Sequence, residues 1–170
     1  MEKSTNLTQQ NIELHRIVST AIIRKDGKYL IVQRNPNRKV FPGRWSLAGG
    51  GLEVSDYIDN PKTTPEAWYY AIENSLKREI KEEVGLEVEN LKYLLDLVFI
   101  RPDNIPVVTL SYYCDWKSGD VKLNEENVDY KWVTVEEAEG YDLISGILEE
   151  IRMADKIYKG ENPSKVEFNF

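Results

Sequence analysis

The apolar residues of this chain gather in several short runs that predict β-strands. Residues 14–23 and 29–32 are rich in strand-forming side chains, and Asp26-Gly27 lies between them. An Asp-Gly pair between two such runs predicts a β-hairpin, because glycine adopts positive φ at little cost. Further strand-like runs follow at residues 91–100, 107–116 and 130–133.

Two other segments show the period of an α-helix. Between residues 65 and 84 an apolar residue recurs at every fourth position, which gives one stripe of Ile72, Leu76, Ile80 and Val84. Gly85 follows, where a glycine commonly ends a helix. A second amphipathic helix is predicted over residues 143–158, with inward-facing Ile144, Ile147, Leu148 and Ile151. The order strands, helix, strands, helix predicts an α/β fold with a mixed sheet flanked by helices.

The length and composition favour a single domain. The chain has 170 residues, 41% of them hydrophobic, which is enough for one core. We interpret residues 1–12 as a flexible polar arm and residues 13–170 as one domain. The net charge of −7 disfavours a nucleic acid partner, because binding to a nucleic acid backbone requires clustered Lys and Arg. A small polyphosphate is still compatible with this charge if a divalent metal ion accompanies it.

Cys114 is the only cysteine, so no internal disulfide can form and a reducing, cytoplasmic location is expected. It lies in an apolar run without a histidine partner, and we interpret it as a packing residue. Residues 1–11 lack the apolar core of a signal peptide, and no run approaches the ~18 apolar residues of a membrane span. We therefore expect no membrane partner, and a homodimer stays open.

Three glutamates carry the candidate chemistry. Glu79, Glu82 and Glu83 stand at i, i+3 and i+4 of the first predicted helix, so they share a face about a quarter turn from the apolar stripe. We expect this face to line a cleft. Packed carboxylates repel one another unless a cation lies among them, and Mg²⁺ prefers such oxygen ligands. Arg78 can reach Glu82 one turn away and hold its carboxylate in place.

The alternative is a solvated acidic face, which Lys77 and Lys81 would also suit. The surrounding residues argue against it. Residues 78–86 read R-E-I-K-E-E-V-G-L, which resembles the second half of the Nudix box, G-x5-E-x7-R-E-U-x-E-E-x-G-U, where U is apolar. Residues 45–53 resemble the W-x-L-P-G-G-x-U-E strand and turn of the same family. The resemblance covers roughly residues 14–150 and implies the Nudix α/β/α sandwich.

The chain departs from the family pattern in three places. Counted from Gly50, Asp56 stands where the box has Glu, and Ala48 replaces the usual proline. The spacer of seven residues before the arginine is here twenty-one residues long, residues 57–77, which amounts to an insertion of about fourteen residues at 57–70. Such an insertion is tolerated, because the entropy of closing a loop grows slowly with its length.

The resemblance also implies roles for individual residues. The metal ligands would be Glu79, Glu82, Glu83 and the Gly49 carbonyl, and the ion would be Mg²⁺, with Mn²⁺ as a substitute. Glu79 or Glu83 would take the proton of the attacking water, with Arg78 as a catalytic neighbour. Glu126 would be a further ligand or base, or alternatively a solvated loop acid. The candidates for substrate binding are Arg34, Arg44, Gly50, Trp68 and Tyr70. For the arginines a salt bridge is the alternative, and for the aromatic residues it is packing of the insertion.

These residues together imply Mg²⁺-dependent hydrolysis of a diphosphate linkage in a nucleotide-like substrate. A nucleoside triphosphate and an ADP-ribose-like molecule both fit. Pro102 lies sixteen positions after Leu86, as in ADP-ribose-cleaving relatives, but it also fits a plain turn. Two other functions are open: a nucleotide-sensing module that binds without cleaving, and a diphosphate isomerase, which would need a catalytic cysteine at the site.

Overall fold

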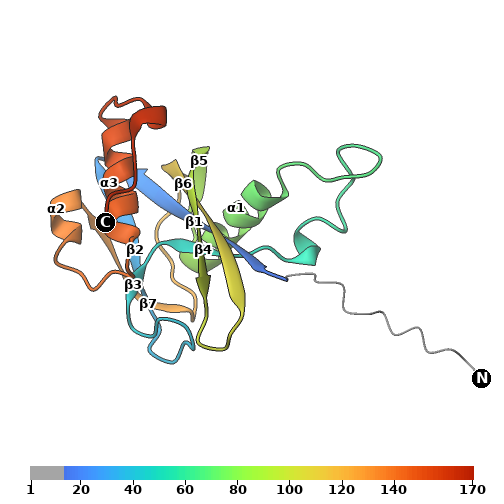
Figure 1. The fold of residues 1–170 in the computed structure, drawn as a ribbon, viewed down its shortest axis with the longest axis horizontal. Coiled ribbons are helices and arrows are strands. Elements are labelled where there is room, and N and C mark those ends of the chain that lie inside the picture. The colour runs from blue at the N-terminus through green and yellow to red at the C-terminus, as the bar shows by residue number, and fades with distance from the viewer. Residues whose placement is uncertain (1–13) are drawn as a thin grey trace, which may run out of the picture.

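The computed structural model describes residues 14–170, in which one mixed sheet is the central layer (Figure 1). The strands are β1 (Arg16–Lys25), β2 (Lys28–Arg34), β3 (Trp45–Ser46), β4 (Ala48–Gly51), β5 (Glu87–Ile100), β6 (Pro106–Ser118) and β7 (Asn127–Val133). Their order is β3-β2-β1-β6-β5, with β4 paired to β1 and β7 paired to β2. Only β1 and β6 run parallel; the other pairs are antiparallel. The predicted arm, residues 1–12, lies outside the described residues.

The β1–β2 hairpin turns at the predicted place. Asp26 and Gly27 both have positive φ, 50° and 76°, and Lys25 pairs with Lys28 across the turn. Two successive positive φ angles match the right-handed twist of the flanking strands. The later strands begin earlier than their apolar runs suggest: β5 extends back to Glu87 and β7 to Asn127. Pairing with a neighbouring strand holds these polar residues in the sheet.

Helices cover both faces of the sheet (Figure 1). Helix α1 (Ala71–Val84) buries its predicted stripe in one core cluster, and α3 (Ile147–Tyr158) packs in the other with the short α2 (Val135–Ala138). The core residues of β1 alternate between the two clusters, Ala21 and Ile23 in the first and Ile22 in the second. This alternation follows from the period of two in a strand, so the expected α/β/α sandwich is confirmed.

Both long helices begin later than their sequence patterns suggest. Helix α1 starts at Ala71, because Tyr70 adopts a left-handed conformation with φ 60° and breaks the helix there. Helix α3 starts after Gly146, whose φ is 94°, while Leu143 bridges to Trp45 of β3. The end of α1 is as predicted, since Gly85 is left-handed and its N–H bonds to the Lys81 carbonyl at 3.0 Å.

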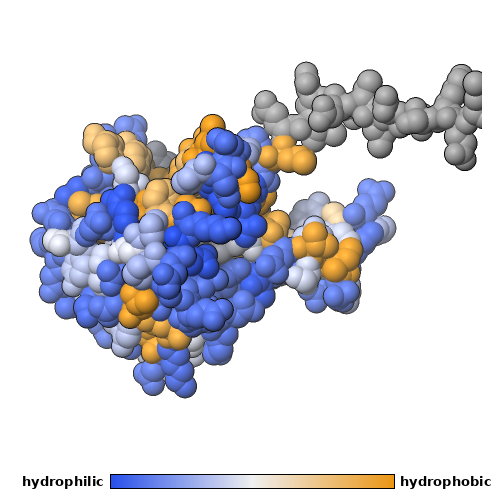
Figure 2. All heavy atoms as spheres, turned by 90° about the horizontal axis from the view of Figure 1, so that it is seen from below, coloured by the Kyte–Doolittle hydropathy of each residue, from blue (hydrophilic) through white to orange (hydrophobic). Residues whose placement is uncertain are grey.

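The insertion, residues 57–70, forms a loop that projects beside the sandwich (Figures 1 and 2). It follows a short 3₁₀ helix, η1 (Val54–Asp56), and leads into α1. The loop packs on itself: the Trp68 ring lies 5.3 Å from the Tyr57 ring, and its Nε1 donates to the Asn60 carbonyl at 2.8 Å. Tyr70, by contrast, is 72% exposed. Across residues 14–170, no helix is long and apolar enough to cross a membrane.

Candidate active site

A polar cavity of about 530 Å³ opens between α1, η1 and the loop before β7. It is lined by Glu53, Ser55, Asp56, Asn60, Asn74, Arg78, Glu79, Glu82 and Glu126. Five of these nine side chains are carboxylic acids and one is an arginine. The cavity therefore combines strong negative potential with a single guanidinium, which suits the binding of a cation.

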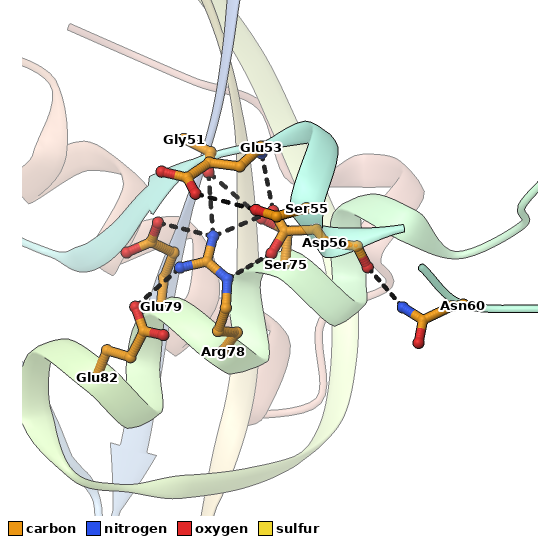
Figure 3. Close-up of polar contacts among 9 residues, drawn as sticks. All are labelled: Gly51, Glu53, Ser55, Asp56, Asn60, Ser75, Arg78, Glu79 and Glu82. Atoms are coloured by element: carbon orange, nitrogen blue, oxygen red, sulfur yellow. Dashed lines mark hydrogen bonds and ion pairs between the residues drawn. The ribbon is translucent and has the colours of Figure 1, made fainter. Parts of the chain in front are cut away.

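Arg78 occupies the middle of the acidic cluster (Figure 3). Its guanidinium pairs with Asp56 through two nitrogens, with Glu79 at 3.0 Å and with Glu82 at 2.9 Å. The expected contact with Glu82 one turn away is thus present. In this arrangement the single positive charge of Arg78 is shared among three carboxylates.

Asp56 takes the place of the box glutamate in this network. The side chain is buried, and its hydrogen bonds to Arg78 lower the pKa of the carboxyl to about 2. The Asp56–Arg78 pair joins the two ends of the insertion, because Asp56 precedes it and Arg78 lies in the second turn of α1. The insertion therefore leaves the two halves of the motif in contact.

The glycine turn makes room for Glu79. A Cβ atom on Gly50 would lie 2.2 Å from the Cδ of the Glu79 carboxylate, so any side chain at Gly50 would displace it. Gly49 has a similar constraint, since a Cβ there would lie 2.1 Å from the Ser19 carbonyl oxygen of β1. The three-glycine run thus lets β4 lie between β1 and the carboxylates of α1. Burial raises the pKa of Glu79 above its ordinary value.

Glu83 does not line the cavity, contrary to the expectation that all three glutamates share one cleft. Its side chain is only 4% exposed. The Gly49 N–H donates to one carboxylate oxygen at 2.7 Å, and Asn127 Nδ2 donates to the other at 2.6 Å. The physical reason is the packing of α1 on β4. This packing places the Glu83 side chain of α1 beneath the glycine turn at residues 49–51. Burial raises the pKa of Glu83 to about 7, although both hydrogen bonds act in the opposite direction.

The carboxylates suit a hard divalent cation by their chemistry. Glu79 and Glu82 present oxygen atoms in the cavity, and each oxygen of Glu83 accepts only one N–H in the described contacts. Within residues 14–170, no three acidic, His or Cys side chains converge on a common metal position. Arg78 instead pairs with Glu79 and Glu82, and its positive charge offsets part of their negative charge.

The remaining predicted residues lie at different distances from the cavity. Glu126 lines it and pairs with Arg38 at 3.2 Å. Arg34 is half-buried, donates to the Val40 carbonyl at 3.0 Å, and lies close enough to Glu83 and Glu126 to interact with their charges. Arg44 is held elsewhere, by Asp142 at 3.0 Å and by the Leu143 carbonyl. It does not line the cavity.

The aromatic candidates of the insertion also differ from one another. Trp68 packs inside the loop, as the structural alternative proposed, whereas Tyr70 is exposed at the start of α1. Pro102 lies in the exposed β5–β6 turn, where Arg101 N–H bonds to the Ile105 carbonyl at 3.0 Å. Neither Trp68 nor Pro102 lines the cavity.

Several residues of the site were not predicted from the sequence. Glu53 could have been identified, because it is the last residue of the W-x-L-P-G-G-x-U-E pattern. Asn74, Arg38 and Asn127 match no motif. Cys114 is fully buried in the core on the α1 side of the sheet, and burial raises its pKa. No cysteine lines the described cavity, so the cysteine that an isomerase would use is missing there.

Known proteins share both the sequence and the fold. The profile of the NUDIX domain family matches residues 13–151. The nucleoside triphosphatase NudI of Escherichia coli O81 (strain ED1a) is 33% identical over 138 residues, which span 75% of this chain and 88% of the relative.

Two solved structures show the same fold. The MutT NUDIX hydrolase from Burkholderia pseudomallei has a TM-score of 0.64 at 23% identity, covering 85% of this chain and 98% of the other. The NUDIX domain of Shewanella oneidensis NrtR, complexed with ADP ribose, has a TM-score of 0.67 at 17% identity, covering 93% and 99%. The family profile, the relatives and the glutamate-bearing helix agree: this chain belongs to the Nudix hydrolases and is a pyrophosphohydrolase of that family.

Proposed function

We propose that this Nudix hydrolase cleaves the diphosphate linkage of a nucleoside triphosphate with the help of Mg²⁺, for which Mn²⁺ can substitute. The observation that carries the proposal is the cavity lined by Glu79, Glu82 and Glu126, with Glu79 lying against Gly50 of the glycine turn. The choice of a nucleoside triphosphate follows the NudI relative, at 33% identity. ADP-ribose is the second candidate to test, since its diphosphate bridge presents the same chemistry.

The carboxylates of α1 would hold the metal ion, with Glu79 and Glu82 from the cavity side, Glu83 from beneath and the Gly49 carbonyl as a further ligand. A bound divalent ion neutralises charge on phosphate oxygens and lowers the pKa of a bound water. We propose Glu79 as the residue that accepts the proton of the attacking water, because it reaches the cavity. Both oxygens of Glu83, the other sequence candidate, are already engaged by N–H groups.

Arg34 and Arg38 are the candidates for phosphate contacts, because Arg38 pairs with Glu126, which lines the cavity, and Arg34 lies close enough to interact with the charge of Glu126. Arginine binds phosphate oxygens through paired N–H donors. Arg44 is left out of this proposal, since Asp142 and Leu143 already hold its guanidinium. Glu126 would serve the metal or the water once substrate draws Arg38 away from it.

The products and the fate of solvent oxygen test the proposal. A nucleoside triphosphate is expected to give the monophosphate and diphosphate, and ADP-ribose, if accepted, two phosphomonoesters. Turnover in ¹⁸O-labelled water should place one label on a phosphorus of the cleaved bridge. A panel of nucleotides with Mg²⁺, analysed by mass spectrometry, gives both readouts.

The outcome also separates the alternatives. Terminal orthophosphate as the only labelled product would contradict the proposal and indicate a phosphatase. Binding without any turnover would indicate a sensing module, and a rearranged product without label an isomerase.

We further propose that the insertion selects the substrate rather than performing chemistry. Asn60 of the insertion lines the cavity, and the exposed Tyr70 stands at the start of the helix that carries the glutamates. An exposed aromatic ring there is positioned to stack on a base. Gly50, in turn, would serve the substrate by letting the turn approach its phosphates closely.

Replacing residues 57–70 by a short Gly/Ser linker should therefore change KM or the ranking of substrates more than the maximal rate on a small substrate. The point variant Tyr70→Asn is the sharper probe, because asparagine tolerates the left-handed backbone found there. Kinetics across the nucleotide panel measure both variants, with thermal unfolding as the control for folding. An unchanged substrate profile in the folded linker variant would show that the insertion only packs against the domain.

A further inference from the structure

Asn127 contacts Glu83 from β7, a strand that carries no residue of the Nudix box. It is the first residue of β7, where it pairs with Arg34 of β2, and it is only 5% exposed. Its Nδ2 donates to Glu83 Oε1 at 2.6 Å. Its Oδ1 is buried and has no hydrogen-bond partner in the described structure.

Three separate elements thus meet at one carboxylate. Glu83 comes from α1, the Gly49 N–H from β4 and the Asn127 amide from β7. Because each oxygen of Glu83 accepts one N–H, the plane of the carboxylate is fixed, while each oxygen keeps a lone pair for another partner. The loop before β7 is itself tied to the end of α1, since Lys122 N–H bonds to the Val84 carbonyl at 2.9 Å and Asn124 N–H to the Glu83 carbonyl at 3.1 Å.

The unpartnered Oδ1 argues against a purely structural role for Asn127. A buried acceptor without a partner costs free energy, and an apolar side chain of similar shape would avoid that cost. A leucine would also fill this buried position in a strand. Packing alone therefore does not explain why an amide occupies this position. The described hydrogen bond of the amide is the one that Nδ2 donates to Glu83.

We propose that Asn127 is a positioning residue, which holds the Glu83 carboxylate in the orientation that binds the catalytic metal ion. This inference rests on the proposed function. Partners that hydrogen-bond a metal ligand orient it for the ion, and their loss commonly lowers metal affinity or activity by about 10- to 100-fold. With the Gly49 N–H as the sole donor, the Glu83 carboxylate could rotate about that hydrogen bond and its second oxygen would no longer be held in place.

Two variants of Asn127 test the proposal. Asn127→Leu keeps the shape but removes the donor, and Asn127→Asp keeps the shape but replaces the amide donor by a carboxylate, which adds a negative charge beside Glu83. Both are expected to lower kcat by about 10- to 100-fold while KM changes by less than about threefold. Calorimetric titration with Mn²⁺ alone should show at least about tenfold weaker binding for Asn127→Leu. Its metal-free melting temperature should fall only modestly, because loss of the donor to Glu83 is partly offset by removal of the unpartnered Oδ1 acceptor.

Asn90→Asp is the matched control. Asn90 Nδ2 also donates to a carboxylate, that of Asp115 at 3.0 Å, but on the exposed β5–β6 edge away from the cavity. This variant should keep wild-type kcat and Mn²⁺ affinity. An equal loss in Asn90→Asp and in Asn127→Asp would overturn the proposal, because the effect would then not depend on Glu83.

The remaining outcomes are also decisive. Wild-type kcat and Mn²⁺ affinity in Asn127→Leu would show that the donor is not needed. A large drop in the melting temperature of Asn127→Leu, with lost activity in proportion, would assign Asn127 a structural role instead. Failure of the proposed function looks different, since the wild type itself would then neither bind Mn²⁺ nor hydrolyse the nucleotide panel, and the inference would fall with it.

Discussion

Replacing Glu83 by glutamine is expected to lower turnover at least about 100-fold while the protein stays folded. A neutral amide cannot supply the negative charge that a divalent ion requires. Glutamine also carries one acceptor oxygen and one NH₂ group, so it cannot accept from both the Gly49 N–H and Asn127. Glu82→Gln should also abolish turnover. Steady-state kinetics on the accepted nucleotide measure the loss.

Glu87→Gln is the control for these variants. Glu87 pairs with Lys81 on the exposed surface at 3.3 Å, so its neutralisation should leave kcat unchanged. Activity above a tenth of wild type in both Glu82→Gln and Glu83→Gln would refute the assignment of these residues to the metal.

Thermal unfolding of the metal-free Glu83→Gln protein adds a readout that does not depend on activity. The pKa of Glu83 is raised by burial from 4.5 to about 7, so between these pH values the folded state binds more protons than the unfolded state. The wild type should therefore lose stability as pH rises through this window, on the order of 3 kcal/mol by pH 8. The glutamine variant lacks this titration, and the stability difference should move in its favour with rising pH.

Removal of divalent metal should abolish hydrolysis altogether. Five carboxylic acids line the cavity against one arginine, so without a bound cation the triphosphate meets strong repulsion. Excess chelator should stop turnover, and added Mg²⁺ or Mn²⁺ should restore it. Ca²⁺ should restore it poorly, because it is larger and tolerates irregular coordination.

Initial rates in chelexed buffer, with each ion added back singly, measure this dependence. A parallel melting curve should show Mg²⁺ stabilising the wild type more than Glu83→Gln, since an ion that binds only the folded state raises its stability. Full activity in excess chelator would end the metal mechanism, whatever the behaviour of the glutamate variants.

Residue spacing and turn residues along the sequence determined the position of several elements of this fold. The four-residue spacing of apolar positions located α1, and the i, i+3, i+4 spacing of its glutamates put them on one side of that helix. The Asp26-Gly27 turn and the helix end at Gly85 followed from single residues with positive φ. These features could be predicted because helix period, turn chemistry and capping depend on residues a few positions apart.

Only the tertiary structure decided how the glutamates divide between the cavity and the interior. Packing of α1 on β4 buried Glu83 and left Glu79, one helix turn away, in the space beside Gly50, a difference that the helix period does not resolve. The structure also brought Asp56 to Arg78 across the insertion and Asn127 to Glu83 across forty-four positions. Such pairings depend on which strands the sheet places side by side, and a single sequence carries no local signal for them.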